Sequence, residues 1–200
     1  MGAFYFVDKI ENMKNLKDID VAGKKVLVRV DFNVPLNANQ EITDDTRMQK
    51  ALPTIKYLLD EGAKVILASH LGRPESKLKE DGSTDVEKFT LRNLVDHLAE
   101  LTGTKVHFAA STIGGETEVL ADKLQEGEIL LLENTRFLPG EKKGDMEMAI
   151  GLSRLADVYV NDAFGACHRE HASVSTITKL MPSCAGFLVE KEVLELSKIL

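Results

Sequence analysis

Four apolar runs in this sequence each end in polar side chains that could bind an anion. These side chains are Asp31 and Asn33 after the first run, His70 and Arg73 after the second, Arg136 after the third and Arg169 after the fourth. Guanidinium and imidazole groups bind phosphates and carboxylates through charge-assisted hydrogen bonds. Each such bond is worth about 1.5–3 kcal/mol. If the four clusters lie together, the chemistry that they predict is recognition of a small molecule that carries a phosphate and a carboxylate.

Two of these clusters also have a plain structural interpretation. Asp31 and Asn33 could form an Asx-type turn before Pro35, with no ligand involved. Arg136 could be a surface side chain that pairs with Glu133. On local evidence alone, both interpretations stay open.

The remaining basic residues are equally open to two interpretations. His70 and Arg73 flank Leu-Gly at the end of a strand, where they could form a phosphate site or simply be solvated charges. Arg47 stands in the first turn of a predicted helix, where a cation opposes the helix dipole. An anionic ligand would explain this placement, and so would an exposed salt bridge to Asp44.

The apolar, β-branched runs are typical of buried parallel strands. We predict strands over 24–30, 64–68, 106–108, 128–132 and 158–160. We predict helices from about 43 to Gly62 with a bend at Pro53, and over 91–101, 116–124, 146–155, 173–180 and 188–200; residues 74–88 and 139–144 are predicted loops. In open α/β sheets, ligands bind outside the carboxyl ends of the strands. The four polar clusters follow the strands at that end, so we expect them to converge.

Composition narrows the function classes. A net charge of −7 disfavours nucleic-acid binding through a broad basic face, and no apolar run is long enough to predict a membrane span. Neither a P-loop nor a Gly-x-Gly-x-x-Gly motif occurs. His168 and His171 have no evident third ligand, so no metal site is predicted. Cys167 and Cys184 do not suggest a disulfide scaffold, which favours a reducing, cytoplasmic location.

Several stretches resemble the N-terminal half of phosphoglycerate kinases, and together they span essentially the whole chain. They are Lys25-Val-Leu-Val-Arg-Val-Asp-Phe-Asn-Val-Pro35, Ser69-His-Leu-Gly-Arg-Pro74, Leu132-Glu-Asn-Thr-Arg-Phe137, Asn161-Asp-Ala-Phe-Gly165 and His168-Arg-Glu-His-Ala-Ser173. The alternation of strands and helices and this resemblance both predict an α/β fold. The expected architecture is a three-layer, doubly wound (Rossmann-like) parallel sheet with helices on both faces.

The resemblance implies a role for each candidate residue. Asp31 and Asn33 would bind the hydroxyl and carboxylate region of 3-phosphoglycerate. Arg47 would be the catalytic residue, which neutralises charge on the phosphoryl group in flight. The non-transferred 3-phosphate would be held by His70, Arg73, Arg136 and Arg169. The implied reaction is the glycolytic phosphoryl transfer between Mg-ATP and 3-phosphoglycerate, which gives ADP and 1,3-bisphosphoglycerate.

The resemblance also implies a domain arrangement. Residues 1–186 would form the substrate-binding domain, and 187–200 would begin an interdomain helix. The family's nucleotide-binding C-terminal domain is absent from this sequence, so we expect no cofactor or metal site here, and substrate binding without turnover. The alternative is an isolated or split binding or folding module with no activity of its own. We expect a monomer, although the apolar residues of the terminal helix leave a dimer open, and we expect no nucleic-acid or membrane partner.

Overall fold

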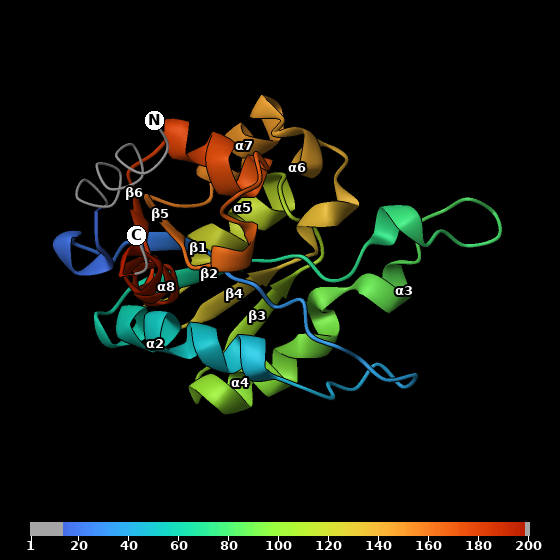
Figure 1. Ribbon diagram of the computed structural model, residues 1–200, viewed down its shortest axis with the longest axis horizontal. Coiled ribbons are helices and arrows are strands. Elements are labelled where there is room, and N and C mark those ends of the chain that lie inside the picture. The colour runs from blue at the N-terminus through green and yellow to red at the C-terminus, as the bar shows by residue number, and fades with distance from the viewer. Residues whose placement is uncertain (1–13, 199–200) are drawn as a thin grey trace.

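A parallel β-sheet forms the centre of the computed structural model, which describes residues 14–198. Its six strands lie in the order β3-β4-β2-β1-β5-β6 (Figure 1). They are β1 (Lys25–Arg29), β2 (Lys64–Ala68), β3 (Val106–Ala109), β4 (Ile129–Leu132), β5 (Val158–Asn161) and β6 (Ser183–Ala185). All the pairings between these strands are parallel. The predicted doubly wound α/β class is confirmed.

The strands are buried on both faces because their side chains alternate between two apolar layers. In β1, Val26 and Val28 face one layer and Leu27 faces the other. Helices α2 (Thr46–Asp60) and α4 (Val95–Thr102) cover the first face. Helices α5 (Gly115–Lys123) and α7 (Met146–Ser153) cover the second (Figure 1). Helices on both faces are what near-continuous apolar strands require.

Shorter helical segments connect these elements. They are α3 (Val86–Phe89) and α6 (Gly140–Lys143), a π-helical turn over Ala172–Thr176, and 3₁₀ turns over Leu16–Asp18, Pro74–Ser76, Leu91–Leu94, Thr135–Phe137, Phe164–Ala166 and Ile177–Lys179. Helices α3 and α6 lie within 74–88 and 139–144, so the prediction that these two segments are loops is wrong there. Likewise, the predicted helix over 173–180 is a π turn followed by a 3₁₀ turn.

Helix α8 (Phe187–Ser197) is partly buried. Val189 is only 6% exposed, and the Phe187 ring meets the edge of the Tyr57 ring at 5.2 Å between centroids. One face of α8 therefore packs on α2. Leu194 and Leu196 remain exposed on the other side. Across residues 14–198, no helix has the length and apolar character needed to cross a bilayer.

Candidate anion-binding site

Five of the seven candidate residues line one cavity at the carboxyl ends of the strands. The four polar clusters follow β1, β2, β4 and β5, which are adjacent in the sheet. The cavity has a volume of about 420 Å³ and is lined by Asn33, His70, Gly72, Arg73, Lys77, Phe89, Arg136 and Arg169. This lining includes four cationic side chains and no carboxylate, so the cavity is suited to an anion.

A buried amide positions Arg136 at this cavity. The side chain of Asn134 is 0% exposed, and its Oδ1 accepts the Arg136 N–H at 3.0 Å. Its Nδ2 donates to the carbonyls of Leu71 at 2.8 Å and Phe89 at 2.9 Å. One side chain thereby connects the segments that follow β2 and β4 with the end of α3.

Glu133 does not pair with Arg136. Its carboxylate accepts from the Thr90 hydroxyl at 2.7 Å and from the Leu91 N–H at 2.9 Å. The interpretation of Arg136 as a surface partner of Glu133 is therefore wrong. Arg136 Nη1 instead donates to the Gly72 carbonyl at 2.6 Å. Its Nε is buried without a partner among residues 14–198, which leaves a donor that a bound anion could satisfy.

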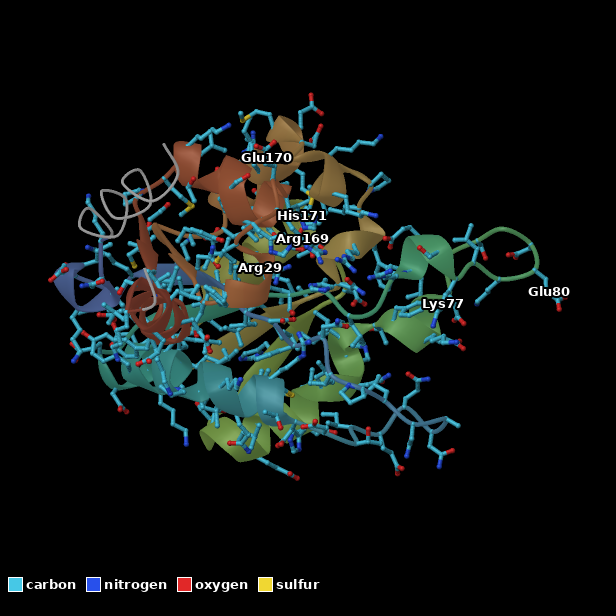
Figure 2. The ribbon with its side chains drawn as sticks, viewed as in Figure 1. Arg29, Lys77, Glu80, Arg169, Glu170 and His171 are labelled. Carbon is cyan, nitrogen blue, oxygen red and sulfur yellow. The ribbon has the colours of Figure 1, made fainter. Side chains whose placement is uncertain are left out.

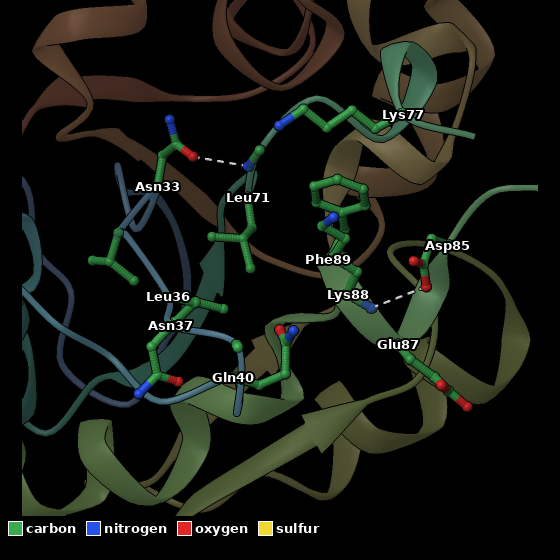
Figure 3. Close-up of a pocket in the computed structure, with 13 residues that line it drawn as sticks. Asn33, Leu36, Asn37, Gln40, Leu71, Lys77, Asp85, Glu87, Lys88 and Phe89 are labelled. Carbon is green, nitrogen blue, oxygen red and sulfur yellow. Dashed lines mark hydrogen bonds between the residues drawn. The ribbon is translucent and has the colours of Figure 1, made fainter. Parts of the chain in front are cut away.

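Gly72 shapes the cavity through its backbone. Its φ is +64°, and a Cβ there would lie 2.5 Å from Cε1 of Phe89. Asn33 Oδ1 accepts the Gly72 N–H at 2.8 Å (Figure 3). Asn33, Gly72, Lys77 and Phe89 also line a neighbouring cavity of about 640 Å³ (Figure 3). A residue other than glycine at position 72 would displace the Phe89 ring, which lines both cavities.

Asp31 and Arg47 lie outside the lining and pair with each other. Arg47 Nη1 donates a hydrogen bond to Asp31 Oδ2 in a salt bridge, and the Arg47 side chain is 50% exposed. Asp44 instead accepts the Thr46 N–H at 2.8 Å, so the alternative Arg47–Asp44 bridge is not formed. The Asn33 N–H donates a long hydrogen bond of 3.4 Å to Asp31 Oδ1, which forms the predicted Asx-type turn. The ligand interpretation and the turn are therefore compatible.

His70 is buried beside several cations. Burial and the charges of Arg29, Arg136, Arg169 and His171 lower the pKa of His70 to about 2. The imidazole is therefore neutral near pH 7. It can still donate one hydrogen bond to an anion.

The segment that carries Arg169 follows β5 in the chain and brings this side chain to the cavity. Arg169 Nε donates to His168 Nε2 at 3.3 Å, and the backbone carbonyl of His171 accepts from Val174 and Ser175 at the start of the π turn. Figure 2 shows Arg29, Arg169 and His171 gathered near the centre of the molecule. No group of three or more His, Cys, Asp or Glu side chains in residues 14–198 is arranged to hold a metal.

Sequence reasoning missed three residues behind the cavity, namely Arg29, Glu141 and Ser173. Arg29 is 1% exposed, yet it ends strand β1 directly after the apolar residues 26–28. A cation within a buried strand needs a partner, and that requirement was the available signal. Nothing in the sequence around Glu141 indicates that it is the partner.

Comparison with known proteins agrees with this architecture. A family model described as phosphoglycerate kinase matches residues 16–200. Phosphoglycerate kinases of Herpetosiphon aurantiacus and Desulforudis audaxviator are 50% and 52% identical over 189 and 187 residues, which are 94% of this chain and 46% of each relative. The chain thus spans about half the length of these curated relatives.

Solved structures show the same likeness. The phosphoglycerate kinase of Coxiella burnetii superposes with a TM-score of 0.79 at 31% identity, over 94% of this chain and 45% of that one. The enzyme of Pyrococcus horikoshii gives 0.81 at 32% identity, over 93% and 45%.

Proposed function

The chain belongs to the phosphoglycerate kinase family, and we propose that it is the half that binds 3-phosphoglycerate for phosphoryl transfer in glycolysis. The observation that carries this proposal is the cavity lined by four cationic side chains and His70. Its volume of about 420 Å³ suits a small metabolite. The family membership supplies the identity of that metabolite.

We place the 3-phosphate of the substrate in this cavity. Arg73, Arg136 and Arg169 reach it from the segments after three different strands. Planar guanidinium groups match phosphate oxygens in pairs, and the unpartnered Nε of Arg136 offers one such donor. His70 contributes a neutral donor, so binding requires no proton uptake by its ring.

The carboxylate end of the substrate is proposed to lie toward Asp31 and Asn33. Asn33 lines the cavity, and its Oδ1 is occupied by Gly72, so its Nδ2 is the group that would face the ligand. Asp31 holds Arg47 near the start of α2. When the substrate carboxylate attacks the transferred phosphoryl group, Arg47 would move onto the developing negative charge. Such reactions rely mainly on positioning and electrostatic stabilisation.

The nucleotide, Mg-ATP or Mg-ADP, is proposed to bind to the C-terminal half that the longer relatives carry. This chain would then bind substrate but not turn it over alone. A coupled assay for ADP formation tests this part directly, and turnover by the chain alone would contradict it. Cytoplasmic location follows from the same proposal, because glycolysis takes place there.

Amide NMR titrations test the binding proposal. We expect 3-phosphoglycerate to shift the resonances of residues 31–33, 70–73, 136 and 169, whereas glycerate, which has no phosphate, should bind at least tenfold more weakly. Arg136→Gln should weaken binding by about tenfold or more. Arg154→Gln is a matched control, because Arg154 is 65% exposed and is not among the residues that line the cavity. Equal binding of both ligands, or no loss in Arg136→Gln, would refute the proposed phosphate site.

A further inference from the structure

Arg29 lies directly behind the cavity but does not line it. Its Nε donates to Ser173 Oγ at 2.8 Å, and its Nη1 donates to the Val30 carbonyl. Its Nη2 lies 3.2 Å from Nδ1 of His70. The guanidinium is thus bonded on three sides, and one of those bonds reaches a residue of the candidate site.

A buried carboxylate compensates the charge of Arg29. Glu141, in α6, is 1% exposed and has Oε1 at 3.8 Å from Arg29 Nη2. The same carboxylate accepts from Ser173 Oγ at 2.5 Å and from Ser173 N at 3.0 Å. The Tyr159 hydroxyl donates to the Ser173 carbonyl at 2.7 Å. Because isolated buried charges are costly, this network holds Arg29 in one place.

The contact with Arg29 determines where the proton of His70 lies. A guanidinium has only donors, so Nδ1 of His70 must act as the acceptor. A neutral imidazole that accepts at Nδ1 carries its proton at Nε2. The cations around the ring are Arg29 from β1, Arg136 after β4 and Arg169 after β5. His171, also after β5, is titratable: burial lowers its pKa, and its Nδ1 lies 3.8 Å from Glu141 Oε1. Glu141, the one carboxylate in the network, is engaged by Ser173.

We propose that Arg29 is a positioning residue, which Glu141 and Ser173 hold in place, and that it fixes His70 as the neutral tautomer with its proton on Nε2. That tautomer presents a permanent hydrogen-bond donor to the anion in the cavity. The identity of the anion as 3-phosphoglycerate rests on the proposed function, but the tautomer does not. The arrangement replaces a titrating histidine with a fixed neutral donor, so His70 keeps its role when the pH rises above about 6.5.

Long-range ¹H–¹⁵N NMR of the ligand-free chain, labelled at histidine, reads the tautomer directly. We expect His70 to show a protonated Nε2 and an unprotonated Nδ1 from about pH 5 to about pH 8. The signals of His97, whose Nε2 pairs with Asp45, appear in the same spectra and can be compared with those of His70. A proton on Nδ1 of His70, or a titration midpoint of His70 inside this pH range, would overturn the proposal.

A double variant tests whether Arg29 is the cause. Arg29→Gln with Glu141→Gln removes both buried charges together, and we expect His70 to show both tautomers. The control, Arg154→Gln with Glu118→Gln, removes an exposed pair at 4.0 Å and should leave His70 unchanged. If the double variant does not fold, Ser173→Ala keeps both charges but removes the hydroxyl that joins them. A folded double variant that retains the Nε2 proton alone would refute the role of Arg29, and the same result in Ser173→Ala would refute the role of Ser173 in holding Arg29 in place.

Titration of 3-phosphoglycerate into the same samples separates this inference from the proposed function. We expect the double variant to bind more weakly at about pH 8 in proportion to the fraction of His70 that keeps its proton on Nε2, which is about a twofold loss when the two tautomers are equally populated. Unchanged affinity in a variant with mixed tautomers would show that the proton on Nε2 is not used by the ligand, and would overturn the positioning role. Failure of the wild-type chain to bind, with its Nε2 proton present, would refute the proposed function alone.

Discussion

Replacing Asn134 with alanine removes the amide that joins three segments around the candidate site. The carbonyls of Leu71 and Phe89 would each lose a donor, and the Arg136 N–H would lose its acceptor. A buried polar group left without a partner costs about 1–3 kcal/mol. Arg136 is only partly buried, so water can replace the acceptor that its N–H loses, and the two carbonyls account for most of the cost. We therefore expect Asn134→Ala to lower the free energy of unfolding by about 3–4 kcal/mol.

Asn37 provides a matched control for this prediction. Its side chain also makes three hydrogen bonds, from Nδ2 to Glu41 and to Oδ1 from the N–H groups of Asn39 and Glu41. These bonds are exposed, so water can replace them, and Asn37→Ala should cost less than about 1 kcal/mol. Urea unfolding of the two variants and the wild-type chain measures both effects. Equal losses, or a loss below about 1 kcal/mol for Asn134→Ala, would refute the reasoning from burial.

Two further predictions concern backbone strain and pH. Gly72→Ala should cost more than about 2 kcal/mol, because the new Cβ meets Phe89 at 2.5 Å, whereas Gly103→Ala, also at positive φ but with open space around it, should cost only about 1 kcal/mol in urea unfolding; similar losses would contradict this. Burial raises the pKa of Asp162 to about 6, so its contribution to stability is fully present below about pH 4 and is lost as the pH rises through about 6. Relative to Asp162→Asn, the free energy of unfolding of the wild-type chain should therefore rise by about 2–3 kcal/mol between about pH 7 and about pH 4. A difference between the two proteins that does not change with pH would contradict the raised pKa of Asp162.

The sequence predicts most of the architecture because its strands are long, apolar and regularly separated by helices. Strand β6 escaped prediction because it has only three residues and follows Pro182. Its identity as a strand depends on pairing with β5 and on a bridge from Asn15 to Ala185. The Pro and Gly residues of segment 139–144 predict a loop, yet the segment forms a helical turn in which Glu141 is buried against Ser173. In both cases tertiary contacts outweighed the local signal.

The candidate residues were recognisable because each cluster follows a strand at the same end of the sheet. Topology alone then brings His70, Arg73, Arg136 and Arg169 together. The supporting network was not recognisable in the same way. Arg29 lies inside an apolar run, and Ser173 and Glu141 come from segments more than a hundred residues away. Side-chain pairing over such separations has no local pattern in a single sequence.

The order of the strands also bears on how this chain folds. Strands β1 and β5 pair side by side, although the Lys25–Asp157 contact between their ends spans 132 residues. Parallel pairing over such separations closes large loops before any stabilising contact forms, which slows folding. The cavity needs both strands, so on the ribosome it cannot exist until Arg169 has emerged. A metabolite that binds there would stabilise only chains in which β1 and β5 have already paired.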